Sequence, residues 1–98
     1  AKYSKHRIIR VVCAALDIDS PVLFNPDRRK PVVFARNIAM WFLHEKLNWS
    51  YNRIAVFFEK DHTTILNSFL RIEQYPELYR PAIAKCEELF DEVGKDIK

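Results

Sequence analysis

The stretch that decides the fold is residues 50–75, SYNRIAVFFEKDHTTILNSFLRIEQY. Its apolar residues recur at helical spacing in two segments, about residues 51–58 and 62–74. Ser50 can cap the first helix and Asp61 the second, because a short side-chain oxygen accepts hydrogen bonds from the free N–H groups of a helix's first turn. Only a tight break separates the two segments. Two short helices joined in this way form a helix-turn-helix pattern.

The second of these helices has two distinct faces, since residues three or four apart share a side of a helix. One side is apolar and predicts packing against a core: Ile65, Phe69 and Ile72. The opposite side is polar, with residues spaced by four: Thr63, Asn67 and Arg71. This division predicts a helix that lies on the protein surface and presents hydrogen-bonding groups to a partner.

Helical spacing, caps and prolines define further segments on either side. They fall at about residues 4–16, 20–24, 31–47 and 81–93. Pro31 and Pro81 suit the first turn of a helix. Gly94 suits the position that follows the last turn. The sequence therefore predicts an all-α protein, a compact single domain of five or six helices over residues 1–98.

The composition excludes several function classes. The 98 residues include one glycine, Gly94, whereas a P-loop or a dinucleotide fingerprint needs several so that backbone N–H groups can approach phosphate. We expect no bound nucleotide and no other cofactor. No apolar run approaches the ~18 residues of a membrane span, and no signal peptide is recognisable. We therefore expect a cytoplasmic protein, without membrane partners, in which Cys13 and Cys86 are reduced and buried.

The sequence contains no group of residues with the spacing typical of a metal site or a catalytic site. His44 and Glu45 begin like a zinc-protease motif, but Asn48 stands where the second histidine is required. The three histidines are too dispersed to suggest a shared metal ion. Nor does any serine or threonine combine with a base and an oxyanion donor. We expect no metal, no catalytic residues and no enzymatic activity.

The charge is unevenly distributed along the chain. Residues 1–36 carry eight Lys/Arg against three Asp, residues 37–75 carry four of each sign, and residues 76–98 carry four Lys/Arg against six Asp/Glu. A basic first third on a near-neutral body suggests an anionic partner on one face. An ordinary solvated surface is the alternative.

The helix-turn-helix pattern indicates that the anionic partner is DNA. In DNA readers of this type the second helix enters the major groove with its N-terminus first. Short hydrogen-bonding side chains suit base edges there, and asparagine pairs with adenine. The candidate base contacts are Asp61, His62, Thr63, Thr64 and Asn67. The pattern places Lys60 and Arg71 for phosphate contacts, and the basic loop adds Arg29 and Lys30. Arg36 and Ser50 are further candidate phosphate contacts that rest on the resemblance described next.

The order of several short motifs resembles a known family. The motifs are Arg36-Asn37-Ile38-Ala39-Met40, Ser50 with Ile54, Asp61-His62-Thr63-Thr64-Ile65, and Arg71-Ile72-Glu73. They match the order and approximate spacing of R-Q-I/M-A-M, S-x-x-x-I-G, F-G-G-R-D-H-T-T-V and K-I-E in the C-terminal domain, domain IV, of the bacterial chromosomal replication initiator DnaA. The resemblance covers about residues 8–93, and the D-H-T-T stretch is its most specific part.

The resemblance implies a Trp-repressor-like all-α fold that binds double-stranded DNA. The segment Asp61–Thr64 matches the major-groove readers of that family. Arg28 matches the arginine that enters the adjacent minor groove, with Arg29 as a close rival. Lys60 and Arg71 match basic residues of the same surface. The resemblance also implies a role in replication initiation or its regulation, with replication proteins as further partners, in the nucleoid of a bacterium or its phage.

Three departures from the family pattern qualify this implication. The family's Gly-Gly is missing, and the segment Phe57–Lys60 is one residue shorter. Ala55 replaces a glycine, and Asn67 replaces a later histidine. DNA binding carries over, but recognition of the family's own nine-base-pair box does not. The alternative interpretation is a protein–protein interaction module that regulates replication or transcription without reading DNA.

Overall fold

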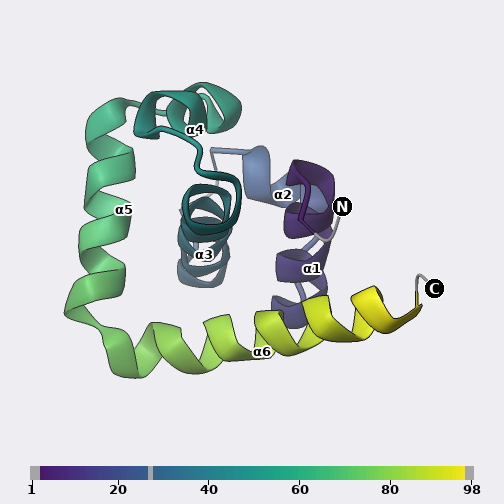
Figure 1. Cartoon of the computed structure of the whole chain (residues 1–98). Coiled ribbons are helices and arrows are strands. Elements are labelled where there is room, and N and C mark those ends of the chain that lie inside the picture. The colour runs from purple at the N-terminus through teal and green to yellow at the C-terminus, as the bar shows by residue number, and fades with distance from the viewer. Residues whose placement is uncertain (1–2, 27, 97–98) are drawn as a thin grey trace.

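The computed structural model describes residues 3–26 and 28–96, and within these ranges it contains six helices and no strand (Figure 1). The helices are α1 (Lys5–Leu16), α2 (Ser20–Phe24), α3 (Lys30–Leu47), α4 (Tyr51–Phe58), α5 (His62–Gln74) and α6 (Pro76–Asp96). The all-α prediction is confirmed. None of these helices combines the length and the apolar character needed to cross a membrane.

Helix α3 runs through the middle of the molecule, and the other helices are arranged around it (Figure 1). It contacts α1, α2, α4 and α5, while α6 packs against α1 and α5. Because neighbours surround α3, its buried residues occupy most of its circumference rather than one stripe. Four of its large side chains are fully buried: Ile38, Met40, Phe42 and Leu43.

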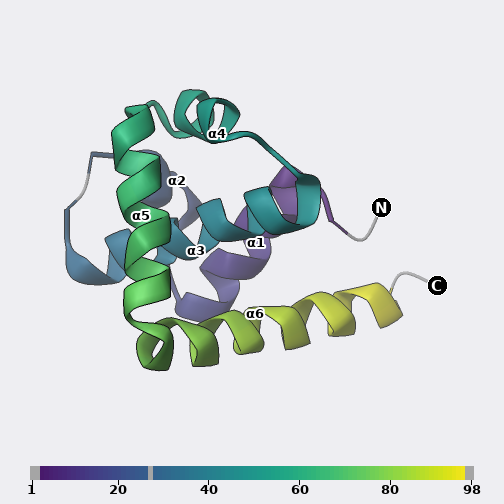
Figure 2. The same ribbon diagram turned by 60° about the vertical axis from the view of Figure 1, so that its left-hand side comes forward.

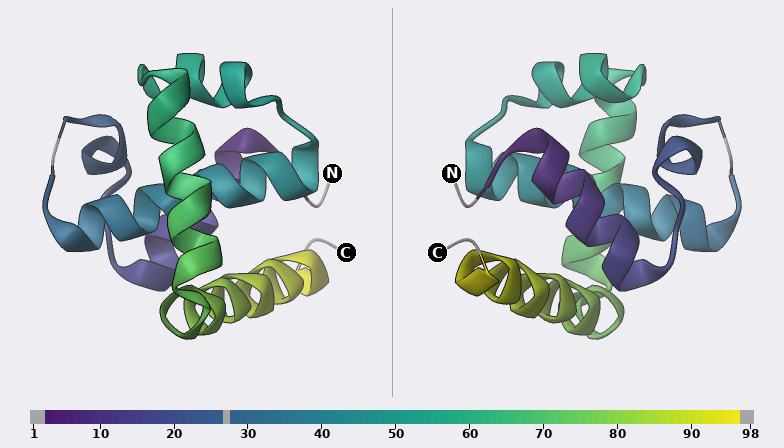
Figure 3. Two further views of the ribbon diagram at one scale, coloured as in Figure 1. Left: turned by 90° about the vertical axis from the view of Figure 1, so that its left-hand side faces the viewer. Right: turned by 90° about the vertical axis from the view of Figure 1, so that its right-hand side faces the viewer.

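Helix α5 lies at the outside, with α4 at its start and α6 at its end. It crosses α3 (Figure 2), and no described segment covers its outer face (Figure 3, left). Arg28, which lies between α2 and α3, lines surface hollows together with residues of α5. This arrangement leaves the second helix of the helix-turn-helix open along its length.

Two serines cap helices at their N-termini as the sequence predicts, whereas Asp61 does not. The Ser4 hydroxyl oxygen accepts from the Arg7 N–H at 3.2 Å, and that of Ser50 accepts from the Arg53 N–H at 3.1 Å. Asp61 has the backbone conformation of an N-cap, but its carboxylate accepts no hydrogen bond from α5. That part of the prediction was wrong. The carboxylate is exposed, and water can solvate it as well as helix N–H groups do.

Helix α6 is longer than predicted at both ends. It begins at Pro76, where a missing N–H costs nothing because first-turn N–H groups have no helical partner. Only Tyr75 separates it from α5. Pro81 lies inside the helix, and Gly94 continues it instead of ending it. No glycine takes the left-handed conformation that a terminating glycine needs.

The two cysteines are free and buried, as predicted. Burial raises the pKa of Cys86 to about 11, and it also raises the pKa of Cys13. A raised folded-state pKa favours the thiol in the native protein up to about pH 9, the ordinary value, and this advantage is lost as the pH rises toward 11.

We expect Cys86 to resist alkylation by iodoacetamide at pH 8, because the reactive species is the thiolate. The comparison is the same chain in guanidinium chloride, where burial is lost and the thiol titrates normally. Mass spectrometry after a short pulse reports the modified fraction at each cysteine. Equal modification of Cys86 in native and denatured protein would show that this site opens freely.

Candidate nucleic-acid interface

A tight turn joins α4 to α5 and sets the direction in which α5 projects. Glu59 takes the left-handed conformation, with φ 55° and ψ 47°. Its N–H donates to the Val56 carbonyl at 3.2 Å, and the Lys60 N–H donates to the Ala55 carbonyl at 2.9 Å. This pair of bonds is a Schellman motif, which normally has glycine at the left-handed position. The turn thus forms without the family's glycines, at the expense of local strain at Glu59.

Replacing Glu59 by glycine is expected to raise the free energy of unfolding by about 0.5–1 kcal/mol, because a left-handed residue with a Cβ costs about 1 kcal/mol. Glu59→Ala is the matched control, since it removes the same charge but keeps the Cβ. Urea denaturation of the three proteins measures the difference. If the alanine variant gains as much as the glycine variant, the gain comes from charge and backbone strain does not explain it.

Helix α5 presents its polar residues to solvent, as its sequence periodicity predicts. His62, Thr63, Thr64 and Asn67 are exposed, and so is Asp61 just before them. On the inner side, Ile65 and Ile72 are buried and Phe69 is half-buried. The first turn of α5 therefore stands free at the surface, which is what entry into a DNA groove requires.

Two leucines on the same helix were not among the predicted site residues. Leu66 and Leu70 are exposed large apolar side chains, about one turn and two turns beyond His62. Their spacing is visible in the sequence, but the apolar stripe of Ile65 and Ile72 is the stronger pattern, and it predicts only the core-facing side of the helix. Because a leucine can contact a thymine methyl group, Leu66 joins the candidate base-reading residues.

The loop between α2 and α3 is held in place by Arg36 of α3. The Arg36 Nε donates to the Leu23 carbonyl and its Nη2 to the Asn25 carbonyl, both at 2.8 Å. The side chain is only 7% exposed. Arg36 was predicted to contact phosphate, and it lines the same hollow as Lys60 and Thr64. Its guanidinium already donates to two carbonyl groups at the end of α2, and these bonds favour a positioning role for the side chain.

The loop arginines separate into two environments. Arg28 lines a hollow between α3 and α5, whereas Arg29 lines a different hollow together with Asp17 and Asp19. The two carboxylates reduce the positive potential around Arg29. The sequence left Arg28 and Arg29 as rivals for the minor-groove role, and this placement favours Arg28.

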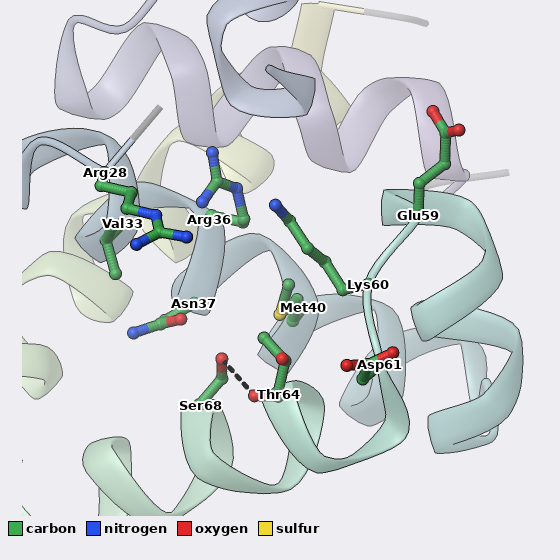
Figure 4. Close-up of a pocket in the computed structure, with 10 residues that line it drawn as sticks. All are labelled: Arg28, Val33, Arg36, Asn37, Met40, Glu59, Lys60, Asp61, Thr64 and Ser68. Atoms are coloured by element: carbon green, nitrogen blue, oxygen red, sulfur yellow. Dashed lines mark hydrogen bonds between the residues drawn. The ribbon is translucent and has the colours of Figure 1, made fainter. Parts of the chain in front are cut away.

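The hollow between α3 and α5, named here the first hollow, has a volume of about 400 Å³. Figure 4 shows Lys60 extending across it toward α3, with Arg28 on the far side, while Glu59 points away. Thr64 and Ser68 form its α5 wall, where the Ser68 hydroxyl donates to the Thr64 carbonyl at 3.0 Å. Asp61 also borders this hollow. Cations from two separate segments of the chain thus converge beside the first turn of α5.

The remaining predicted contacts lie along or beyond this surface. Lys30 and Arg71 line a second hollow, which adjoins the first and shares Arg28 with it. Ser50 lies apart from both hollows, where its hydroxyl caps α4. Arg28, Lys30, Lys60 and Arg71 form no ion pair with any residue that the structure describes. Their charge is therefore available to an anionic partner.

Comparison with known proteins places the chain in a family. The model of the family described as bacterial dnaA protein helix-turn-helix matches residues 6–72. The chain is 34% identical over 68 residues to the chromosomal replication initiator protein DnaA 1 of Chlamydia pneumoniae, covering 69% of the chain and 15% of that protein. It is 29% identical over 83 residues to DnaA of Bacteroides thetaiotaomicron, covering 84% and 18%.

A third relative, DnaA of a Synechococcus strain, is 37% identical over 68 residues, covering 68% of the chain. The chain thus spans less than a fifth of the length of these curated relatives, 15–18%. The matched region includes the loop after α2, the turn after α4 and the exposed face of α5. The chain belongs to the bacterial DnaA helix-turn-helix family.

Proposed function

We propose that this chain binds double-stranded DNA, with the N-terminal turn of α5 in the major groove and the α2–α3 loop at the adjacent minor groove. One observation carries the proposal. The exposed polar turn at His62–Thr64 lies beside Arg28 and Lys60, and neither cation is engaged in an ion pair with a described residue. An α-helix fits the major groove, which is about 12 Å wide.

Sequence selection is assigned to the exposed side chains of α5. His62, Thr63, Thr64 and Asn67 offer hydrogen bonds to base edges, and Leu66 offers an apolar contact. Asp61 suits a cytosine amino group, because its carboxylate accepts no bond from the helix. These groups lie on an α-helix, so their relative positions are fixed before DNA arrives.

Affinity is assigned to the cations on the α3 side of α5. Lys60 and Arg28 border the first hollow, and Arg71 and Lys30 continue the line into the second. A phosphate strand that runs between the major and minor grooves would pass along this row. Neutralised phosphates release counterions, so such contacts supply most of the salt-dependent binding energy.

The biological role proposed is DNA recognition in replication initiation or in its regulation. The relatives are chromosomal replication initiator proteins, and the region they share with this chain is its helix-turn-helix. Asn67 stands where the resemblance implies a histidine, and the turn before α5 is one residue shorter. We therefore propose that the preferred site differs from the family's own box.

The proposed function is tested by selecting a preferred site from a randomised duplex pool and measuring binding of a Thr64→Ala variant. The loss on the selected duplex is expected to be about 1–3 kcal/mol, with little change on random duplex, because a base contact discriminates whereas a phosphate contact does not. Thr64 is exposed, so the fold tolerates the change. Equal losses on both duplexes would contradict a reading role for Thr64, and a pool without enrichment would contradict sequence-specific binding.

A further inference from the structure

The second hollow differs in chemistry from the first. It lies where α3 begins, α5 ends and α6 begins, and its volume is about 730 Å³. Two of its side chains are large, apolar and exposed: Tyr75 at 49% and Leu78 at 59%. Tyr75 and Leu78 lie three residues apart where α6 begins and form one exposed apolar patch, and contiguous patches of this kind mark interaction surfaces. Apolar surface offers a phosphate group neither positive charge nor hydrogen bonds, so this part of the lining does not suit a phosphate.

Two aromatic side chains that line this hollow are held by their own contacts. Phe34 and Tyr79 stack on one another with ring centroids 4.6 Å apart. The Tyr79 hydroxyl accepts a hydrogen bond from the Asn37 Nδ2 at 3.0 Å, and Tyr79 is buried. Because Tyr79 is buried and one face of Phe34 is stacked against it, these two rings offer little open surface to an unstacked base. The exposed apolar side chains of the hollow are Leu78, which is aliphatic, and Tyr75, and together they suit the apolar side chains of a peptide.

Three cations border the same hollow: Arg28 and Lys30 on one side and Arg71 on the other. They come from the α2–α3 loop, the start of α3 and the last turn of α5. None of them forms an ion pair with a described residue. Favourable electrostatics therefore require an occupant that carries negative charges on both sides of an apolar group.

We propose that the second hollow binds an acidic peptide segment of a partner protein, with a leucine or aromatic anchor against Leu78 and Tyr75 and with carboxylates toward Arg28, Lys30 and Arg71. A segment of this kind presents apolar area and negative charge together, and duplex DNA presents only the charge. The anchor side chain would carry most of the affinity, since buried apolar or aromatic anchors dominate interface energetics.

The site overlaps the proposed DNA surface at Arg28, Lys30 and Arg71. If the proposed function holds, a bound acidic segment and duplex DNA exclude one another, because both need the same cationic groups. The partner would then act as a regulator that displaces the chain from DNA. This consequence rests on the proposed function, whereas peptide binding itself does not.

The first experiment is selection of a random 12-residue peptide library on the immobilised 98-residue chain, without DNA. Enriched peptides are expected to place Asp or Glu on both sides of Leu, Phe or Trp. A fluorescein-labelled synthetic copy of one enriched peptide then serves as the probe in polarisation titrations. A library that does not enrich, or that enriches peptides without acidic residues, overturns the proposal.

The second experiment locates the probe. Leu78→Ala is expected to weaken probe binding about tenfold or more. The matched control is Val56→Ala, which removes an apolar side chain that is 78% exposed on α4, outside the hollow, and should leave binding within twofold. Both positions are exposed, so neither variant threatens the fold. Equal effects of the two variants would place the probe elsewhere and overturn the proposal.

The third experiment separates this inference from the DNA proposal. Leu78→Ala should leave duplex affinity unchanged, whereas Arg28→Ala should weaken both the probe and the duplex. Probe binding without duplex binding would support the hollow and reject the DNA proposal. Duplex binding with no effect of Leu78→Ala on the probe would reject the hollow and leave DNA binding standing.

Discussion

Replacing Arg36 by methionine is expected to lower the free energy of unfolding by about 3 kcal/mol. Two hydrogen bonds from its guanidinium to the carbonyls of Leu23 and Asn25 are lost, and bonds that involve a charged group contribute about 1.5–3 kcal/mol each. Methionine keeps much of the volume of the buried stem, so the loss reports mainly on these bonds. Urea denaturation of the purified variants gives the value.

Arg36→Lys is the matched control, because it keeps the positive charge but cannot reach both carbonyls in a fork. It should recover only part of the loss. Both variants should also weaken duplex binding, since a loop that is no longer anchored must be ordered when Arg28 meets DNA. A stability change below about 1 kcal/mol in Arg36→Met would contradict the positioning role.

The double variant Arg28→Ala/Lys60→Ala is expected to bind all duplexes about fiftyfold more weakly at 0.1 M salt. Each phosphate contact contributes about −0.9 to the slope of log K against log salt, so the slope should become shallower by about 1.8. Both residues border the first hollow and lack ion-pair partners among the described residues, so their loss should leave the fold intact.

The control for this variant is Arg10→Ala/Lys85→Ala, which removes the same net charge from the exposed surfaces of α1 and α6. It should change the slope little, because α1 and the part of α6 beyond its start extend away from α5 (Figure 1). Fluorescence anisotropy at several salt concentrations, on random and selected duplexes, measures both slopes. Equal slopes for the two double variants would mean that binding follows overall charge and not the first hollow.

Local signals in the sequence were enough to predict much of this fold. Periodicity fixed the two faces of α5, and Ser4 and Ser50 act as caps because a cap depends only on neighbours three residues away. Arg36 could not be placed in the same way. Its partners, Leu23 and Asn25, lie eleven or more residues earlier and approach it only after α2 packs on α3.

In the candidate site, too, the features that depend on neighbours in the sequence could be predicted, and those that depend on tertiary packing could not. That α5 exposes polar side chains could be read from their spacing, whereas the choice between Arg28 and Arg29 depends on which way the loop turns in three dimensions. The second hollow was invisible for a similar reason. Leu78 belongs to a segment where the sequence predicted no helix, and only the early start of α6 brings it beside Arg71 and the loop.

If the chain binds DNA as proposed, the duplex lies against α5 and the α2–α3 loop. The decisive experiment is a titration of the isotopically labelled 98-residue chain with a selected duplex, in which NMR follows the backbone amide shifts. The expected result is that the largest shifts map to residues 60–71 and to the loop at residues 25–30, while the amides of α1 stay nearly unchanged. Shifts that concentrate on α1 or on the middle of α6, with α5 unaffected, would contradict the account.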